Sequence, residues 1–108
     1  MTSFRAAVVQ FEPVPDDPAA NLATIERLAR EAARGGARLV VFPEMCLLGY
    51  WHLRRQTAAR LHSLAEAADG PLVSRVLVLA GELGVGIGVG FLEVADGVLF
   101  NAYAVCLP

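Results

Sequence analysis

Residues 38–44 have the sequence Arg38-Leu39-Val40-Val41-Phe42-Pro43-Glu44, a short apolar run closed by a proline and an acid. Consecutive apolar and β-branched residues predict a strand that is buried on both faces. Pro43 cannot donate to a sheet, so the chain must leave the sheet there and place Glu44 at the carboxyl end of the strand. Open α/β sheets bind their ligands outside this end. The segment therefore predicts a parallel sheet with Glu44 at its mouth.

The residues before this segment predict a first strand and a connecting helix. Residues 5–11 hold a second apolar run, which we expect to be a central strand buried on both faces. Asp17 followed by Pro18 is typical of a helix start, and apolar residues then recur at helical spacing until Gly35-Gly36. The order strand, helix, strand favours a parallel pair joined by a right-handed crossover.

The residues after Glu44 predict two more helices and a β-hairpin. We expect helices from about 53 to 67 and from the break at residues 69–71 to about 83. In residues 85–94 side chains alternate with Gly86, Gly88 and Gly90, which predicts a strand with one bare face against which another segment packs closely. Asp96-Gly97 predicts a turn into an antiparallel strand over residues 98–106. The expected order is β-α-β-α-α-β-β.

Composition argues against several classes of protein. The formal net charge is −2 and the basic residues are scattered among acids, so no basic stripe is available for nucleic acid. The charge-free stretches are shorter than the ~18 to 20 residues of a membrane span, and the first residues lack a signal-peptide pattern. Two cysteines do not support a disulfide framework. We expect a soluble, cytoplasmic protein with no nucleic-acid or membrane partner.

Several segments of the chain resemble one known family. Residues 39–44 together with Gly49-Tyr50 resemble the first catalytic motif of the nitrilase superfamily of carbon–nitrogen hydrolases. Other segments of this chain resemble, in order, the family elements that surround this motif: residues 7–10, Asn21, Gly36-Ala37, Asp69-Gly70-Pro71, residues 88–93 and Asn101-Ala102-Tyr103. The resemblance implies an α/β fold that is part of a four-layer αββα sandwich. It also implies that residues 1–108 are the amino-terminal part of one longer domain, incomplete at its C-terminus.

The resemblance implies an activity as well. Family members hydrolyse non-peptide carbon–nitrogen bonds with a glutamate that moves protons, a cysteine that attacks the carbon and a lysine that stabilises the charged intermediate. The glutamate maps onto Glu44 as general base, whereas all nine basic residues of this chain are arginines. We expect a small amide or carbamoyl substrate rather than a nitrile, no cofactor and a homo-oligomer. This chain alone is expected to be inactive.

Other side chains could carry chemistry. Cys46 lies two residues after Glu44, but the family's nucleophile follows a later strand, so we expect Cys46 and Cys106 to be core or loop residues. Tyr50 either lines a substrate pocket or anchors its loop against the sheet. His52 and His62 are ten residues apart and would not share a helical face, so we expect no metal site.

Two alternatives remain open at this point. The chain could be a non-catalytic truncated relative that serves as an interaction or scaffold piece, and the absent lysine favours that interpretation. It could also be a flavodoxin-like binding domain, because doubly wound sheets place an acid after a strand too. The predicted hairpin argues against the second alternative, since such folds alternate strand and helix to the end.

Overall fold

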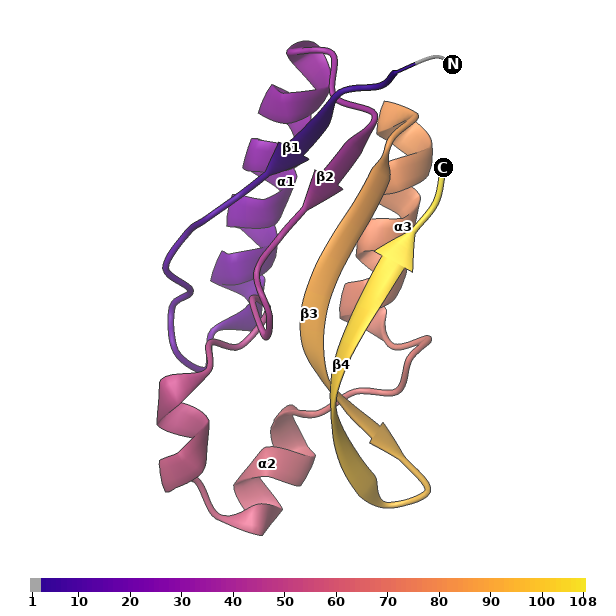
Figure 1. Cartoon of the computed structure of the whole chain (residues 1–108). Coiled ribbons are helices and arrows are strands. Elements are labelled where there is room, and N and C mark those ends of the chain that lie inside the picture. Colours follow the sequence, from indigo (N-terminus) through magenta and orange to yellow (C-terminus); the bar gives the residue numbers. More distant parts are fainter. Residues whose placement is uncertain (1–2) are drawn as a thin grey trace.

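The computed structural model describes residues 3–108 and contains one four-stranded sheet in the order β1-β2-β3-β4 (Figure 1). Strands β1, β2 and β3 are parallel, and β4 is antiparallel to β3. The four strands are, in chain order, Ala6–Val8, Leu39–Val41, Gly86–Ala95 and Val98–Cys106. The predicted α/β class and the predicted order of the main elements are confirmed.

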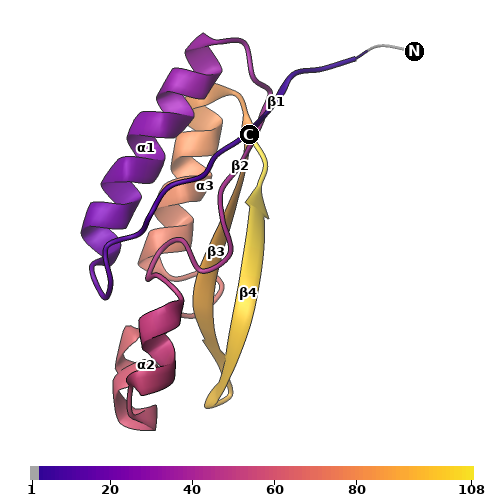
Figure 2. The same ribbon diagram turned by 60° about the vertical axis from the view of Figure 1, so that its left-hand side comes forward.

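Two helices cover one face of the sheet. Helix α1 (Pro18–Arg34) joins β1 to β2, and helix α3 (Pro71–Leu83) precedes β3; Figures 1 and 2 show both on the same side. The Asp17 carboxylate accepts a hydrogen bond from the Ala20 amide at 3.1 Å, which caps α1 as the sequence predicted. No helix within residues 3–108 has the length and apolar character needed to span a membrane.

The main core lies between these helices and the sheet. It consists of fully buried apolar side chains from α1, β2, α3 and β3, among them Ile25, Val40, Val76, Leu79, Ile87 and Val89. Burying one such side chain contributes about 1.5–3 kcal/mol. Because Ile87 and Val89 face the helices, the alternation of the strand turns Gly86, Gly88 and Gly90 to the opposite face. The predicted bare face of this strand is therefore confirmed.

The hairpin between β3 and β4 also follows the prediction. Ala95 pairs with Val98, and the two turn residues, Asp96 and Gly97, have φ angles of 50° and 74°. Two left-handed residues in a two-residue turn are the geometry that matches the twist of a hairpin.

The prediction that residues 5–11 form a central strand is wrong. Strand β1 lies at the edge of the sheet and is three residues long, although backbone hydrogen bonds of Arg5 and Val9 extend its pairing with β2 at both ends. Val8 remains 74% exposed. The apolar run does not encode the position of its strand in the sheet, and within residues 3–108 only one side of β1 is paired, by β2.

The prediction of one helix over residues 53–67 is also wrong. The segment forms a 3₁₀ helix, η1 (Trp51–Arg55), and a separate helix α2 (Ala58–Leu64). Gln56 is extended, and the Thr57 hydroxyl accepts a hydrogen bond from the Arg60 amide at 3.1 Å. A threonine cap therefore starts a new helix inside the predicted one. The predicted apolar stripe persists in Leu53, Leu61 and Leu64, which pack beside Met45, Leu48 and Leu92.

The face of the sheet that carries the glycines is partly uncovered. At one end it is covered by the chain from Met45 to Leu64, but Val8, Tyr103 and Val105 expose 47–74% of their surface. Strand pairing places all three on this face, because Val105 pairs with Gly88 and Tyr103 pairs with Gly90. Val8 pairs with Val41, which in turn pairs with Gly88. An exposed apolar sheet face of this kind favours association.

We predict that the 108-residue chain self-associates through this face. Sedimentation velocity should show a mass that rises with concentration, and Val105→Thr should weaken the association because it places a hydroxyl on the apolar surface. Val78→Thr is the matched control, since Val78 is 53% exposed but lies on α3. A monomer at every concentration, or equal effects of the two variants, would contradict the prediction.

Candidate active site

Glu44 lies where the chain leaves the carboxyl end of β2. The Phe42 amide donates to the Gly88 carbonyl at 2.9 Å just before the chain leaves the strand, and a turn then runs from Glu44 to Leu48. Met45 in this turn has a φ angle of 53°. The Glu44 side chain is exposed, and its Oε1 accepts a hydrogen bond of 2.6 Å from Nδ2 of Asn101 on β4.

The turn lies directly on strand β3 because Gly90 has no side chain. A Cβ atom at Gly90 would overlap the backbone nitrogen of Met45 and come within 2.8 Å of the Glu44 carbonyl carbon. The Gly90 carbonyl accepts from the Leu47 amide at 3.2 Å, so the turn is also hydrogen-bonded to the strand. The backbone of Glu44 can occupy its position only over a glycine.

Gly88 likewise allows a side chain, that of Tyr103, to lie directly on strand β3. A Cβ atom at Gly88 would lie 2.7 Å from the Tyr103 hydroxyl oxygen. The ring of Tyr103 therefore crosses β3 at this glycine, and its hydroxyl donates to the Phe42 carbonyl at 2.7 Å. Strand β4 is thereby connected to the chain just before Glu44.

The other side of the turn is fixed by a buried asparagine. Asn21 of α1 is 1% exposed, and its Nδ2 donates to the Leu47 carbonyl at 3.0 Å and to the Val14 carbonyl at 2.9 Å. Its Oδ1 accepts from the Val14 amide at 2.7 Å. A buried carboxamide whose hydrogen bonds are satisfied in this way holds both backbone segments in place. Asn21 thus joins the turn to the first helix and its preceding loop.

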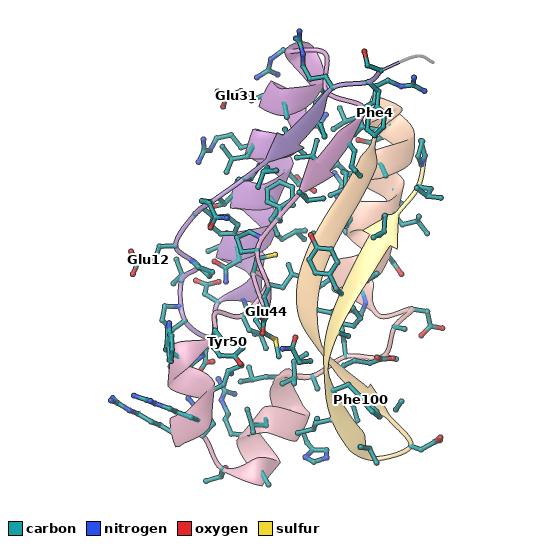
Figure 3. All side chains as sticks on the ribbon, in the orientation of Figure 1. Phe4, Glu12, Glu31, Glu44, Tyr50 and Phe100 are labelled. Carbon is teal, nitrogen blue, oxygen red and sulfur yellow. The ribbon has the colours of Figure 1, made fainter. Side chains whose placement is uncertain are left out.

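An apolar groove of about 340 Å³ borders the turn that carries Glu44, because Met45 and Asn101, the hydrogen-bond partner of Glu44, both line it. Figure 3 shows Glu44 where the chain leaves β2, with Tyr50 and Phe100 labelled on two different parts of the groove wall. The lining residues are Met45, Tyr50, Leu53, Arg54, Leu61, Leu92, Leu99, Phe100 and Asn101. Asn101 belongs both to this wall and to the hydrogen bond with Glu44, so it connects the carboxylate to the groove.

Of the two aromatic residues in the loop, Tyr50 lines the groove and Trp51 does not. Tyr50 is 48% exposed and contacts Trp51 edge-to-face, with ring centroids 5.8 Å apart. Trp51 is 75% exposed and lies under the guanidinium of Arg54. Tyr50 therefore forms part of the groove wall, whereas Trp51 lies outside it.

Cys46 is fully buried under the turn. Burial raises the pKa of its thiol to about 11, and its Sγ donates to the Gly90 carbonyl at 3.7 Å. A thiol in this state is protonated and inaccessible near neutral pH, so Cys46 is unsuited to nucleophilic attack. Cys106 is buried on β4, and burial raises its pKa too.

The two histidines lie in different places. His52 Nε2 lies 2.5 Å from Asp16 Oδ1, whereas His62 Nε2 lies 3.0 Å from the Gly97 carbonyl at the hairpin. Within residues 3–108, no three histidine, cysteine or acidic side chains gather as a metal site would require.

The sequence did not single out Asn21 or Asn101 as site residues. Asn21 left a detectable signal, because it occupies a polar position on the apolar stripe of α1, where a buried polar group needs partners. For Asn101 the signal was its place in the Asn101-Ala102-Tyr103 segment of the family resemblance, since a polar residue in an alternating strand is otherwise ordinary.

Comparison with known proteins identifies the family. Residues 5–107 match the model of the carbon–nitrogen hydrolases. A bromoxynil-specific nitrilase of Klebsiella pneumoniae subsp. ozaenae is 36% identical over 107 residues, covering 92% of this chain and 31% of the nitrilase. The N-carbamoylputrescine amidase of Solanum tuberosum is 35% identical over 99 residues, covering 92% and 32%.

A solved structure agrees with these relatives. XC1258 from Xanthomonas campestris, a CN-hydrolase superfamily protein with an arsenic adduct in its active site, superposes with a TM-score of 0.83 and 27% identity over 100% of this chain and 38% of its own. The chain belongs to the carbon–nitrogen hydrolase family. It spans about a third of the length of the two curated relatives. The flavodoxin-like alternative is therefore wrong.

We predict that Gly90→Ala displaces the turn and lowers the free energy of unfolding by about 1–3 kcal/mol, the usual cost of overpacking a rigid contact. Urea unfolding measures the change. Gly81→Ala is the matched control: Gly81 lies in α3 with nothing near its Cβ position, so alanine should stabilise the protein by about 0.5–1 kcal/mol. Unchanged stability of Gly90→Ala would show that the turn can shift freely.

Proposed function

We propose that Glu44 is the general base of a hydrolase that cleaves a non-peptide carbon–nitrogen bond. The observation that carries this proposal is the exposed Glu44 carboxylate, held by Asn101 beside an apolar groove at the carboxyl end of β2. Among residues 3–108, Glu44 neither caps a helix nor joins an ion pair, which are the usual roles of a structural acid. Its position therefore suits proton transfer.

In the proposed reaction Glu44 moves protons in both halves of the cycle. It first accepts the proton of a cysteine thiol, so that the thiolate can attack the carbon of the substrate, and it returns that proton to the leaving nitrogen. It then takes a proton from the water that hydrolyses the acyl-enzyme and gives this proton to the departing cysteine sulfur, which regenerates the thiol. A lysine stabilises the charged intermediate. We propose that both partners lie outside residues 1–108, because the sequence has no lysine and Cys46 is buried.

We propose a small amide or carbamoyl compound as substrate, with Tyr50 in its binding site. The amidase among the relatives supports this class, although a nitrilase is equally similar. The apolar groove beside Glu44 suits the carbon skeleton of such a molecule. The reaction consists of proton transfers and acyl transfer, which require no cofactor. We also propose a cytoplasmic homo-oligomer.

One observation favours a second candidate. Because the chain has no lysine, a non-catalytic role as an interaction or scaffold piece is consistent with residues 1–108 alone. The two proposals differ in whether Glu44 affects turnover in a protein that also supplies the lysine and the cysteine.

We predict that the purified 108-residue chain hydrolyses neither amides nor nitriles. Ammonia release from a panel of aliphatic and aromatic amides, carbamoyl compounds and nitriles measures this. The control is Cys46→Ala, which should behave like the unmodified chain. Turnover that Cys46→Ala abolishes would make Cys46 the nucleophile and overturn its assignment as a core residue.

We predict that Glu44→Gln lowers kcat by about 10² or more in a longer protein that contains this segment with the lysine and the cysteine. Glutamine keeps the size and one acceptor oxygen but cannot take a proton, so the melting temperature should hardly change. Glu12→Gln is the matched control, because Glu12 is an exposed acid in the loop after β1. Near-normal turnover by Glu44→Gln would favour the non-catalytic role.

A further inference from the structure

We infer that Asn101 is a positioning residue that holds the Glu44 carboxylate in the orientation needed for proton transfer. The inference rests on the proposed function of Glu44 and extends it to strand β4. Its basis is the 2.6 Å hydrogen bond from Asn101 Nδ2 to Glu44 Oε1, which joins side chains 57 positions apart.

The backbone makes this contact part of a regular arrangement. Asn101 pairs with Leu92 and Tyr103 pairs with Gly90, so both β4 side chains point to the face of the sheet on which the turn lies. Tyr103 donates to the Phe42 carbonyl at 2.7 Å, and Asn101 donates to the Glu44 side chain. Tyr103 and Asn101 are two residues apart on β4, and the residues that they contact, Phe42 and Glu44, are also two residues apart. The first contact fixes the backbone and the second fixes the carboxylate.

A carboxamide suits this task. A glutamate side chain has three rotatable torsions, and a single short hydrogen bond from a donor on a paired strand selects among its rotamers. Because the bond occupies Oε1, Oε2 remains for the exchange of a proton. Asparagine carries no charge and does not titrate, so it orients the carboxylate without acting as a counter-ion.

The bond has little importance for stability. Both side chains are exposed, and an exposed hydrogen bond between side chains contributes about 1 kcal/mol or less. Its effect should therefore appear in the rate of the chemical step rather than in folding.

The test is a double-mutant cycle of Asn101→Ala and Glu44→Gln in the longer, active protein. In the unmodified background Asn101→Ala should lower kcat on the order of 10-fold or more, because a misplaced base slows chemistry. In the Glu44→Gln background the same change should have no further effect, since no base remains to be positioned. Asn101→Asp should lose more activity than Asn101→Ala, because it places a second carboxylate against Glu44.

The cycle separates this inference from the proposed function. If Glu44→Gln lowers kcat but Asn101→Ala does not, or if Asn101→Ala has the same effect in both backgrounds, the positioning role is wrong and the base assignment stands. If Glu44→Gln has no effect, both are wrong.

A spectroscopic measurement on the 108-residue chain tests the contact without turnover. The side-chain amide signals of Asn101 in a ¹⁵N–¹H spectrum should shift when Glu44→Ala removes the acceptor. Glu12→Ala should leave these signals unchanged. Asn101 signals that do not respond to Glu44→Ala would show that the bond is not formed in solution, and this would overturn the inference.

Discussion

The close approach of two segments to the bare face of β3 is the constraint on which the candidate site depends. The backbone of Glu44 and Met45 lies so close to Gly90 that there is no room for a methyl group between them. The ring of Tyr103 lies close to Gly88 and leaves no room there either. Side chains at these two positions would force the turn and the tyrosine away from the strand. Glu44 would then lose its backbone position and its connection to β4 together.

This close approach could be predicted from the sequence because the glycines that permit it form a local alternating pattern. Alternating glycines in an apolar strand predicted a closely covered face, and Pro43 predicted the point at which the chain leaves β2. Helix α1 and the hairpin were predictable for the same reason, since the Asp17 cap and the Asp96-Gly97 turn act within a few residues. The position of Glu44 at the end of a parallel strand followed from these elements.

The features that were not predicted depend on distant contacts or on competing local signals. The edge position of β1 depends on where later strands add, which its own residues do not encode. The break between η1 and α2 arises because the cap formed by Thr57 prevailed over a continuous apolar stripe. The partner of Glu44 lies on a strand 57 positions further along the chain, and a single polar residue in a strand does not indicate which side chain it contacts.

The distance in sequence between Glu44 and Asn101 of β4 has a consequence for the order in which this part of the molecule assembles. Glu44 emerges from the ribosome 57 residues before Asn101, and at synthesis rates of 5–20 residues per second this is an interval of about 3 to 11 seconds. During that time β1, α1 and β2 can form, because their contacts lie within the emerged chain. The carboxylate, however, has no partner until the hairpin closes. The contact between Glu44 and Asn101 thus forms after the first part of the sheet has been synthesised.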